Sequence, residues 1–365
     1  MSHSKVILVL GAGATVGAGF KVRHNDGPLE PPLDRNFFES KAVEPIFIRD
    51  RFPVLYHYQR GEEKELETLW SKVDLYHKLC RSGIVSEEHT FLNLAKEIIA
   101  RAQDDHAYRR KMEQESRNWC VPSLGGWELL HLVSEVFKGL HHTTIEESPL
   151  HKIISRLQGE KLLDAIVTFN YDTSVEQLLP DCFYYPLLLN QDAKGKLPLI
   201  KLHGSLNWQA DSRSLPRISV MEPITKMAEM DHDGDRWRQP EVIGPTFFKQ
   251  EINLDFEIPD DFRAPYYKSL WRIAWDRLKV AEYLVFVGFS FAETDFHARV
   301  LFRSAHFSGF GFRQVIVCHR GSKELMPIVR RVFAGGRSEV QPKECDEGLE
   351  SMADRLDELV ALLQN

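Results

Sequence analysis

The sequence has no apolar stretch long enough to cross a membrane as a helix. A membrane-spanning helix needs roughly 20 mostly apolar residues, whereas the apolar run at residues 6–10 meets glycine at once. That run is also shorter than the apolar core of a secretory signal peptide, and no cleavage pattern follows it. We therefore expect a cytoplasmic protein with no membrane partner.

Cysteine is scarce, and the five cysteines stand far apart, at Cys80, Cys120, Cys182, Cys318 and Cys345. No two of them have the short spacing of a zinc knuckle, and their positions do not suggest a disulfide scaffold. A reducing cytoplasm is the simplest setting for such cysteine usage. The sequence therefore predicts no metal site.

Basic residues are outnumbered, since 46 Lys and Arg stand against 53 Asp and Glu, for a formal net charge of −7 at pH 7. A charge of this sign disfavours nonspecific nucleic-acid binding, and we expect no direct contact with nucleic acid. Apolar residues make up 43% and charged residues 27%, as in an ordinary globular protein. A chain of 365 residues exceeds one hydrophobic core, which indicates one large domain with insertions, or two domains.

Apolar strands alternate with amphipathic helices at the start and in the second half of the chain. Such alternation predicts right-handed βαβ units, so the expected fold class is α/β with a Rossmann-like parallel sheet. Small or polar clusters follow four apolar strands, at residues 5–10, 164–169, 197–202 and 283–287. These clusters should gather at the carboxyl edge of the sheet, where ligands bind in such folds.

Strand signals are missing between residues 37 and 159, where helical and charged segments such as 87–114 prevail. We interpret this part as a large helical insertion. We expect residues 209–263 to be irregular, because acidic and Pro-rich pieces interrupt them. The predicted domains are a Rossmann-like domain of residues 1–36 and 160–343, a helical module of residues 37–159, and a C-terminal helix of residues 344–365.

Gly11, Ala12 and Gly13 follow the first strand as in a dinucleotide-binding turn. Glycine lets the backbone turn sharply and approach a pyrophosphate, and free N–H groups at the start of the next helix bind it. The spacing departs from the GxGxxG pattern because Val16 stands where the third glycine belongs. A glycine turn with a purely structural purpose is the alternative.

Asn170, Asp172 and His203 follow two further strands and are candidates for the chemistry. A histidine at such a position can take up a proton near neutral pH. The alternatives are structural, because Asn and Asp are good N-cap residues of helices, and a lone histidine is more often structural or surface-exposed than catalytic.

The segment Gly288–Ser290 suggests another chemistry, the nucleophile elbow of a serine hydrolase. His297 and His306 follow it, and Asp295 is placed to orient one of them. The segment departs from an elbow because Ala292 replaces the final glycine and the next helix begins too late. A serine hydrolase is therefore the minor alternative.

Taken together, the four clusters resemble the motifs of the sirtuin family. They read GAGAT from Gly11, NYD from Asn170, HGS from His203 and GFS from Gly288, in the order of that family. The resemblance implies a sirtuin-like Rossmann domain that binds a nicotinamide dinucleotide.

Three longer segments look still more like the bacterial sirtuin-like NAD hydrolases of antiphage defence. They are KLHGSLNW at residues 201–208, IGPTFFK at residues 243–249 and VGFSFAETDFH at residues 287–297. The resemblance covers residues 1–35 and about 160–320.

Two departures separate the chain from the protein-deacylating sirtuins. Those enzymes carry a four-cysteine zinc module soon after His-Gly-Ser, but here no cysteine lies between Cys182 and Cys318. We therefore expect no zinc, and deacylation is disfavoured because that module helps to build the acyl-peptide cleft. The Pro-Asp-Phe-Arg segment of deacylases has only a loose counterpart in Pro32–Arg35, where Asp34 is a candidate cofactor-binding residue.

The resemblance also implies a role for each site residue. Asn170 would hold the ribose hydroxyls or the attacking water, His203 would accept a proton from one of them, and Asp172 would orient the site. The residues implied in holding the phosphates, the adenosine ribose and the adenine are Gly11, Ala12, Gly13, Thr15, Gly288, Ser290, His319 and Arg320.

The function implied is that of an enzyme, an NAD hydrolase that takes NAD as its substrate and releases nicotinamide and ADP-ribose. Unrestrained hydrolysis of NAD would be toxic, so we expect a defence effector controlled by assembly into a homo-oligomer or by a partner such as a HerA-type ATPase. The alternatives are an NAD-dependent protein deacylase and a non-catalytic module that binds NAD or ADP-ribose.

Overall fold

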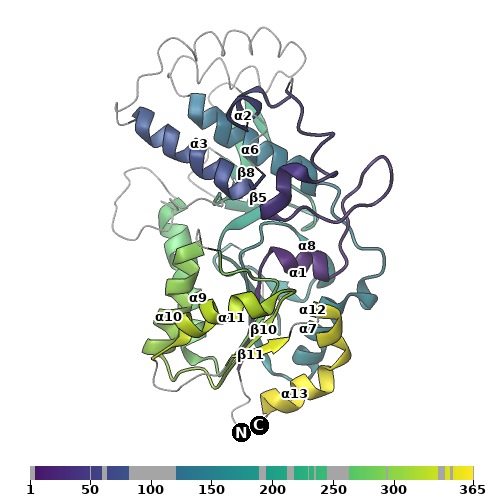
Figure 1. The fold of residues 1–365 in the computed structure, drawn as a ribbon, viewed down its shortest axis with the longest axis vertical. Helices are drawn as coiled ribbons and strands as arrows, with labels where there is room; N and C mark the ends of the chain where they lie inside the picture. The colour runs from purple at the N-terminus through teal and green to yellow at the C-terminus, as the bar shows by residue number, and fades with distance from the viewer. Residues whose placement is uncertain are drawn as a thin grey trace. The chain divides into compact units, whose positions relative to one another are not determined.

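A computed structural model describes residues 5–49, 51–59, 64–81, 121–188, 195–211, 218–228, 230–233, 236–244, 263–292, 295–335, 342–345 and 348–364. The chain forms two compact units, and Figure 1 shows the elements of each. Unit 1 comprises Met1–Lys21, His141–Gly204 and Glu251–Asn365, and unit 2 comprises Val22–Leu140 and Ser205–Gln250.

Unit 1 is built on a parallel sheet that has seven strands among the described residues, in the order β11-β10-β9-β1-β2-β4-β3. The strands are β1 (Val6–Leu10), β2 (Leu163–Thr168), β3 (Phe183–Tyr184), β4 (Leu197–Lys201), β9 (Tyr283–Val287), β10 (Gln314–Cys318) and β11 (Lys343–Cys345). Every residue of β1, β4 and β9 is buried, which explains why these segments are apolar throughout instead of alternating. The predicted α/β class with a parallel sheet is confirmed.

The helices of unit 1 form two groups by contact. One group is α9 (Arg263–Val280), α10 (Phe296–Ser308) and α11 (Ser322–Phe333), and the other is α1 (Ala12–Gly17), α7 (Pro149–Gly159), α12 (Gly348–Asp354) and α13 (Leu356–Gln364). In Figure 1 the first group lies to the left of the sheet and the second to the right, as in a sheet covered on both faces. The short elements α8 (Ser174–Leu178) and η2 (Ile145–Glu147) also belong to this unit.

Helix α7 shows how the sequence dictates one of these contacts. Pro149 stands in its first turn, where a missing N–H costs nothing, and its buried residues are Leu150, Ile153, Ile154 and Leu157. These four follow the three- and four-residue spacing of one helix face. That face packs against β2, α1 and α12 and so covers the sheet beside the candidate site.

Unit 2 combines helices with an antiparallel sheet. The helices are η1 (Asp34–Glu39), α2 (Pro53–Gln59), α3 (Leu66–Arg81) and α6 (Val121–Phe137). The strands are β5 (Gly204–Asp211), β6 (Ile218–Val220), β7 (Asp231–Asp233) and β8 (Arg236–Val242), in the order β6-β5-β8-β7. Helix α6 contacts both α2 and α3, and it also contacts β8, which ties the helices to the sheet.

Several expectations about single segments need correction. Residues 209–263 are not irregular throughout, since most of β5 and all of β6–β8 fall within them. The predicted last helix is two helices, α12 and α13, and the predicted helix at residues 87–114 lies outside the described residues. The two compact units divide the chain at other positions than the predicted modules, since β8 packs on α6 and α7 packs on β2, and the predicted domain boundaries stay a prediction.

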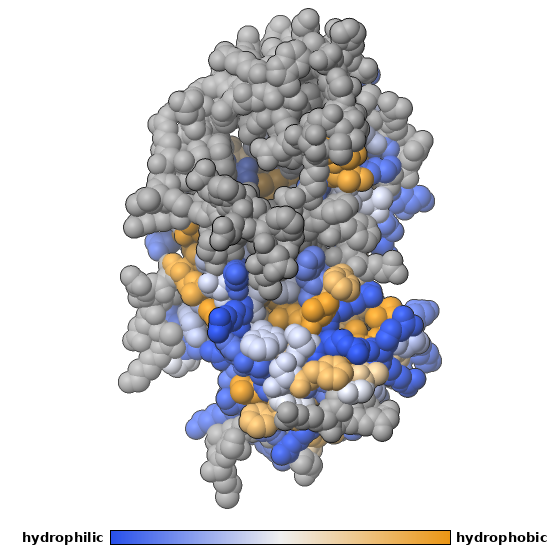
Figure 2. All heavy atoms as spheres, turned by 90° about the vertical axis from the view of Figure 1, so that its left-hand side faces the viewer, coloured by the Kyte–Doolittle hydropathy of each residue, from blue (hydrophilic) through white to orange (hydrophobic). Residues whose placement is uncertain are grey.

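The surface of unit 1 on the side of α9 and α10 mixes apolar and charged residues, as Figure 2 shows. Helix α10 leaves Phe296, Val300 and Phe307 exposed, and the guanidinium of Arg303 lies 5.1 Å from the centre of the Phe307 ring. Among the described helices, none combines the length and the apolar character needed to cross a membrane.

Candidate functional site

The candidate site lies at the edge of the sheet where the chain order reverses. Strand β1 has β2 on one side and β9 on the other, and in open α/β sheets ligands bind beyond the carboxyl ends of the strands at such a point. The predicted clusters follow β1, β2, β4 and β9 directly. The structure therefore brings the ends of four separate segments to one edge.

Two glycine clusters pack backbone against backbone at this edge. The N–H of Gly11 donates to the carbonyl of Val287, and the N–H of Gly13 donates to the carbonyl of Gly288, both at 3.0 Å. Gly288 has a φ of +60°, and a Cβ on it would lie 2.1 Å from the backbone nitrogen of Ala14. Only glycine fits so close an approach. These glycines therefore have a structural role, which is the alternative that the sequence left open for this turn.

The predicted contact of this turn with phosphates stays a prediction. Two of the backbone N–H groups in the turn already donate hydrogen bonds within the chain, so they are not available to bind a phosphate. The N–H groups of Gly11 and Gly13 are both bonded within the chain. Ala12 is exposed at the start of α1 and Gly13 is half-buried, so this is the part of the turn that a ligand can reach.

Asn170 is held in one orientation by its side-chain amide. Its Nδ2 donates to the carbonyl of Gly11 at 2.9 Å and to Oγ1 of Thr15 at 3.2 Å, and its backbone N–H donates to Oγ1 of Thr168. Among the described residues, Oδ1 of Asn170 accepts no hydrogen bond. A buried amide with its nitrogen fixed in this way presents its oxygen as an acceptor for a hydroxyl or a water.

Asp172 is buried and both of its carboxylate oxygens are engaged. Oδ2 accepts from the hydroxyl of Thr15 at 2.8 Å, and Oδ1 accepts from the backbone N–H of Ser174 at 2.9 Å. The second bond links residues two apart, so it forms a local Asx turn just before α8. Asp172 therefore has the structural role that the sequence left open, and through Thr15 it also supports Asn170.

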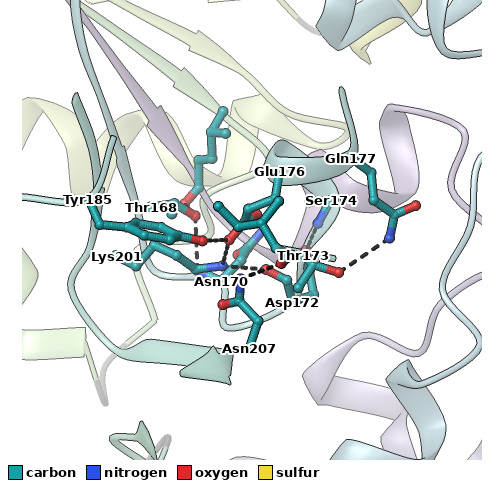
Figure 3. Close-up of polar contacts among 12 residues, drawn as sticks. Thr168, Asn170, Asp172, Thr173, Ser174, Glu176, Gln177, Tyr185, Lys201 and Asn207 are labelled. Atoms are coloured by element: carbon teal, nitrogen blue, oxygen red, sulfur yellow. Dashed lines mark hydrogen bonds and ion pairs between the residues drawn. The ribbon is translucent and has the colours of Figure 1, made fainter. Parts of the chain in front are cut away.

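A buried ionic network lies beneath this cluster, and the sequence did not reveal it. Nζ of Lys201 donates to Oε1 of Glu176 at 2.7 Å and to the backbone carbonyl of Asp172, and the hydroxyl of Tyr185 donates to the same Oε1 at 2.6 Å (Figure 3). Lys201 and Glu176 are 1% and 0% exposed. A lysine inside an otherwise apolar strand was the available signal, because buried charges need a partner.

His203 lies at the end of β4, next to the strand that carries Asn170. It is 5% exposed, and its ring meets the ring of Phe169 edge to face, with the centroids 5.2 Å apart. Nε2 of His203 is 3.7 Å from Oδ1 of Asp295, which directly precedes α10. Sequence reasoning considered Asp295 only as a partner of His297 or His306, so its place beside His203 is new.

The serine hydrolase alternative gains nothing from the structure. Ser290 is exposed, and no hydrogen bond joins it to a histidine among the described residues. His306 is fully buried and stacks on the ring of Phe312, with the centroids 5.5 Å apart. Asp295, the acid that such a triad would use, lies beside His203.

The remaining predicted residues fall in two places. His319 and Arg320 follow β10, at the same edge of the sheet in unit 1, where His319 is half-buried and Arg320 is exposed. Asp34 belongs to unit 2, and its Oδ1 accepts the backbone N–H of Glu67 at 2.7 Å. That bond gives Asp34 a structural role at the start of α3, and its contact with a cofactor stays a prediction.

No protein-family model and no curated protein sequence matches the chain. Similar solved structures include a complex of a Sir2 homologue with NAD, at 12% identity over 100% of this chain and 92% of that chain, with a TM-score of 0.45. A Sir2 homologue mutant with 2'-O-acetyl ADP ribose has 12% identity, coverages of 100% and 94%, and a TM-score of 0.44. Another mutant, with ADP ribose, has 11% identity, coverages of 99% and 95%, and a TM-score of 0.43. Likeness at this distance does not assign a reaction to the chain.

Proposed function

We propose that unit 1 binds a nicotinamide dinucleotide at the carboxyl ends of β1, β2, β4 and β9 and hydrolyses its nicotinamide–ribose bond. One observation carries this proposal. A fixed amide oxygen acceptor, Asn170 Oδ1, and a buried imidazole with a carboxylate partner, His203 with Asp295, follow neighbouring strands. The resemblance of the four sequence clusters to sirtuin motifs supplies the substrate class.

Cleavage of this bond does not require the enzyme to protonate the leaving group. Nicotinamide carries a positive charge while it is bonded to ribose, so it leaves as a neutral molecule when the bond to C1' breaks. Positive charge then develops on the ribose ring, as in the hydrolysis of glycosides. Water forms the new bond to C1' and gives up one proton, so the products are nicotinamide, ADP-ribose and that proton.

The site residues divide this work between them. Oδ1 of Asn170 accepts a hydrogen bond from a ribose hydroxyl or from the attacking water, because its nitrogen is already committed to Gly11 and Thr15. His203 accepts the proton as general base. Asp295, 3.7 Å from Nε2, stabilises the imidazolium that forms.

Water is the acceptor that we propose, instead of an acylated lysine. The support is the sequence itself, in which no cysteine lies between Cys182 and Cys318, so a four-thiolate zinc module cannot form there. In deacylating sirtuins that module follows the His-Gly-Ser motif and helps to build the peptide cleft. A chain that resembles sirtuins without this module is better suited to small acceptors, and we propose that it works without zinc.

The test is to incubate the full chain with NAD and to quantify nicotinamide and ADP-ribose. Asn170→Ala and His203→Ala should each lower turnover by roughly 10²–10⁴-fold, the usual range for a positioned acid–base group. His151→Ala is the matched control, since His151 lies on α7 and, within the part of the chain that the structure describes, forms a hydrogen bond only with Ser155 of the same helix. Full activity in both site variants would overturn the assignment, and nicotinamide release that requires an acyl-lysine peptide would show a deacylase.

The cellular role follows from the same resemblance. We propose an NAD-depleting defence effector that is held inactive until it assembles as a homo-oligomer or joins a partner such as a HerA-type ATPase. The supporting consideration is that constant NAD hydrolysis would harm the cell. Turnover measured with and without the candidate partner, at matched chain concentration, tests this control, and equal activity in all conditions would contradict it.

A further inference from the structure

Two cysteines face each other on the last two strands of the described sheet. Cys318 ends β10 and Cys345 ends β11, and the two residues are register partners in this parallel pair. Partners in a parallel pair point to the same face, and neighbouring strands lie about 4.7–4.9 Å apart. That spacing falls within the Cα separation of roughly 4.4–6.8 Å seen in disulfides.

We propose that Cys318 and Cys345 are a two-electron oxidation site, whose dithiol is converted to a reversible disulfide by peroxides. The two side chains already interact, because a hydrogen bond to Cys345 and burial both raise the pKa of the Cys318 thiol. The site is separate from Asn170 and His203, and it does not depend on the activity proposed for them.

The two cysteines differ in access, and that difference sets the order of events. Cys318 is 2% exposed, whereas Cys345 is half-buried on a three-residue strand, with its Sγ 3.9 Å from the carbonyl of Gly348. A thiolate is the reactive form of cysteine, and the raised pKa keeps Cys318 protonated at neutral pH. Cys345 is therefore the thiol that meets the oxidant first.

The reaction balances with hydrogen peroxide as the oxidant. The Cys345 sulfur attacks one peroxide oxygen, the O–O bond breaks, and the products are a sulfenic acid and water. The Cys318 sulfur then attacks the sulfenic sulfur, its proton leaves with the hydroxyl as a second water, and the S–S bond forms. The two thiols together lose two electrons, and the peroxide gains them. A reducing dithiol reverses the change by thiol–disulfide exchange.

The short length of β11 makes room for the bond. Disulfide Cβ atoms lie roughly 3.5–4.5 Å apart, closer than ordinary strand spacing, so one strand must move in by a fraction of an ångström. Strand β11 has three residues and a neighbour on one side only in the described sheet, so it can move more readily than β10. The bond would tie β11 to Cys318, the residue directly before His319, whose N–H donates to the carbonyl of Cys345.

The experiment treats the native full chain with hydrogen peroxide, blocks remaining thiols with iodoacetamide, and maps the peptides by mass spectrometry. We expect loss of alkylation at both Cys318 and Cys345 and a single peptide pair joined through them, lighter by two hydrogen atoms. Treatment with dithiothreitol should restore both alkylation sites. Cys345→Ser should abolish the joined pair, and Cys182→Ser is the matched control that should keep it.

Two results would overturn the proposal. One is oxidation of Cys345 to sulfinic acid in the native chain while Cys318 stays a free thiol, which would show that the sulfurs cannot meet. The other is pairing of either cysteine with Cys80, Cys120 or Cys182 instead. The wild-type peptide map decides between these outcomes without any variant, so a variant that fails to fold does not affect the test.

Discussion

Glu176 in unit 1 and Glu128 in unit 2 are both fully buried, yet their partners differ. Glu176 pairs with the ammonium of Lys201 and the hydroxyl of Tyr185. Glu128 accepts the backbone N–H groups of Val54 at 3.3 Å and Leu55 at 2.8 Å, in the first turn of α2. One glutamate is therefore held by a second buried charge, and the other by amides at the start of a helix.

The difference shows how closely each carboxylate is tied to the candidate site. Nζ of Lys201 also donates to the backbone carbonyl of Asp172, so the ion pair of unit 1 is hydrogen-bonded directly to a residue of the candidate site. Glu128 supplies hydrogen bonds at an end of α2, where backbone N–H groups lack partners within the helix. We infer that a change to the first pair disturbs both stability and turnover, whereas a change to the second disturbs stability alone.

The largest expected effect is that of Lys201→Met, which keeps an unbranched side chain of nearly the same length and removes its charge. Glu176 would then be a buried carboxylate without its cation, at a cost of about 3–5 kcal/mol in the free energy of unfolding. Urea denaturation measures this loss, and NAD turnover should fall as well. The exposed Lys152→Met on α7 is the matched control.

A double variant separates the charge from the shape of the network. Lys201→Met with Glu176→Leu removes both charges, and a buried pair replaced by apolar residues is often close to neutral in stability. We expect the double variant to regain most of the stability but not the turnover, because nothing then holds the Asp172 carbonyl. If Lys201→Met alone were as stable as the wild type, the claim that Glu176 depends on the charge of Lys201 would be wrong.

The second effect is that of Glu128→Gln, which keeps the shape but turns one acceptor oxygen into a donor. That donor would face a backbone N–H at the start of α2, and we expect a loss of about 1–3 kcal/mol. Turnover of NAD should stay at the wild-type level in urea-free buffer. The exposed Glu44→Gln in unit 2 is the control. A fall in turnover that matches Lys201→Met would break the contrast between the two units.

The two units also differ in how much of their structure could be predicted from the sequence. The strands before Gly11, Asn170, His203 and Gly288 could be predicted, because buried parallel strands are apolar throughout and polar clusters mark their ends. The antiparallel strands β6 and β7 were missed because they have only three residues each, and β8 was missed because charged residues and Pro240 interrupt it. Periodicity is a weak signal in segments of this kind.

The interaction partners of buried polar residues could not be predicted from the sequence either. Asp295 was visible as a carboxylate near two histidines of its own segment, but its neighbour His203 is distant in sequence. Lys201 was read as part of an apolar strand, and its partners Glu176 and Tyr185 became evident only when α8 and β4 were placed side by side. Such pairs depend on how elements pack, which local patterns do not encode.

The smallest expected effect concerns a half-exposed ion pair of unit 2, Arg51 with Glu135, whose atoms lie 2.8 Å apart. Burial raises the pKa of Glu135, but the hydrogen bond and charge of Arg51, with Lys138 and His131, outweigh it and leave that pKa below its ordinary value of 4.5. A carboxyl with a lowered pKa in the folded state stabilises the fold above the ordinary value. It loses that contribution as the pH falls through the folded-state pKa.

Glu135→Gln should therefore lower the free energy of unfolding by no more than about 1 kcal/mol at pH 7, because solvent screens a pair in which Arg51 is 40% exposed. The difference from the wild type should shrink as the pH falls below 4.5 and as salt is added. Urea denaturation at several pH values measures it, and Glu39→Gln, in the more exposed pair with Lys64, is the control that should show less. If the difference in the free energy of unfolding grew as the pH fell, burial, and not Arg51, would dominate the pKa of Glu135.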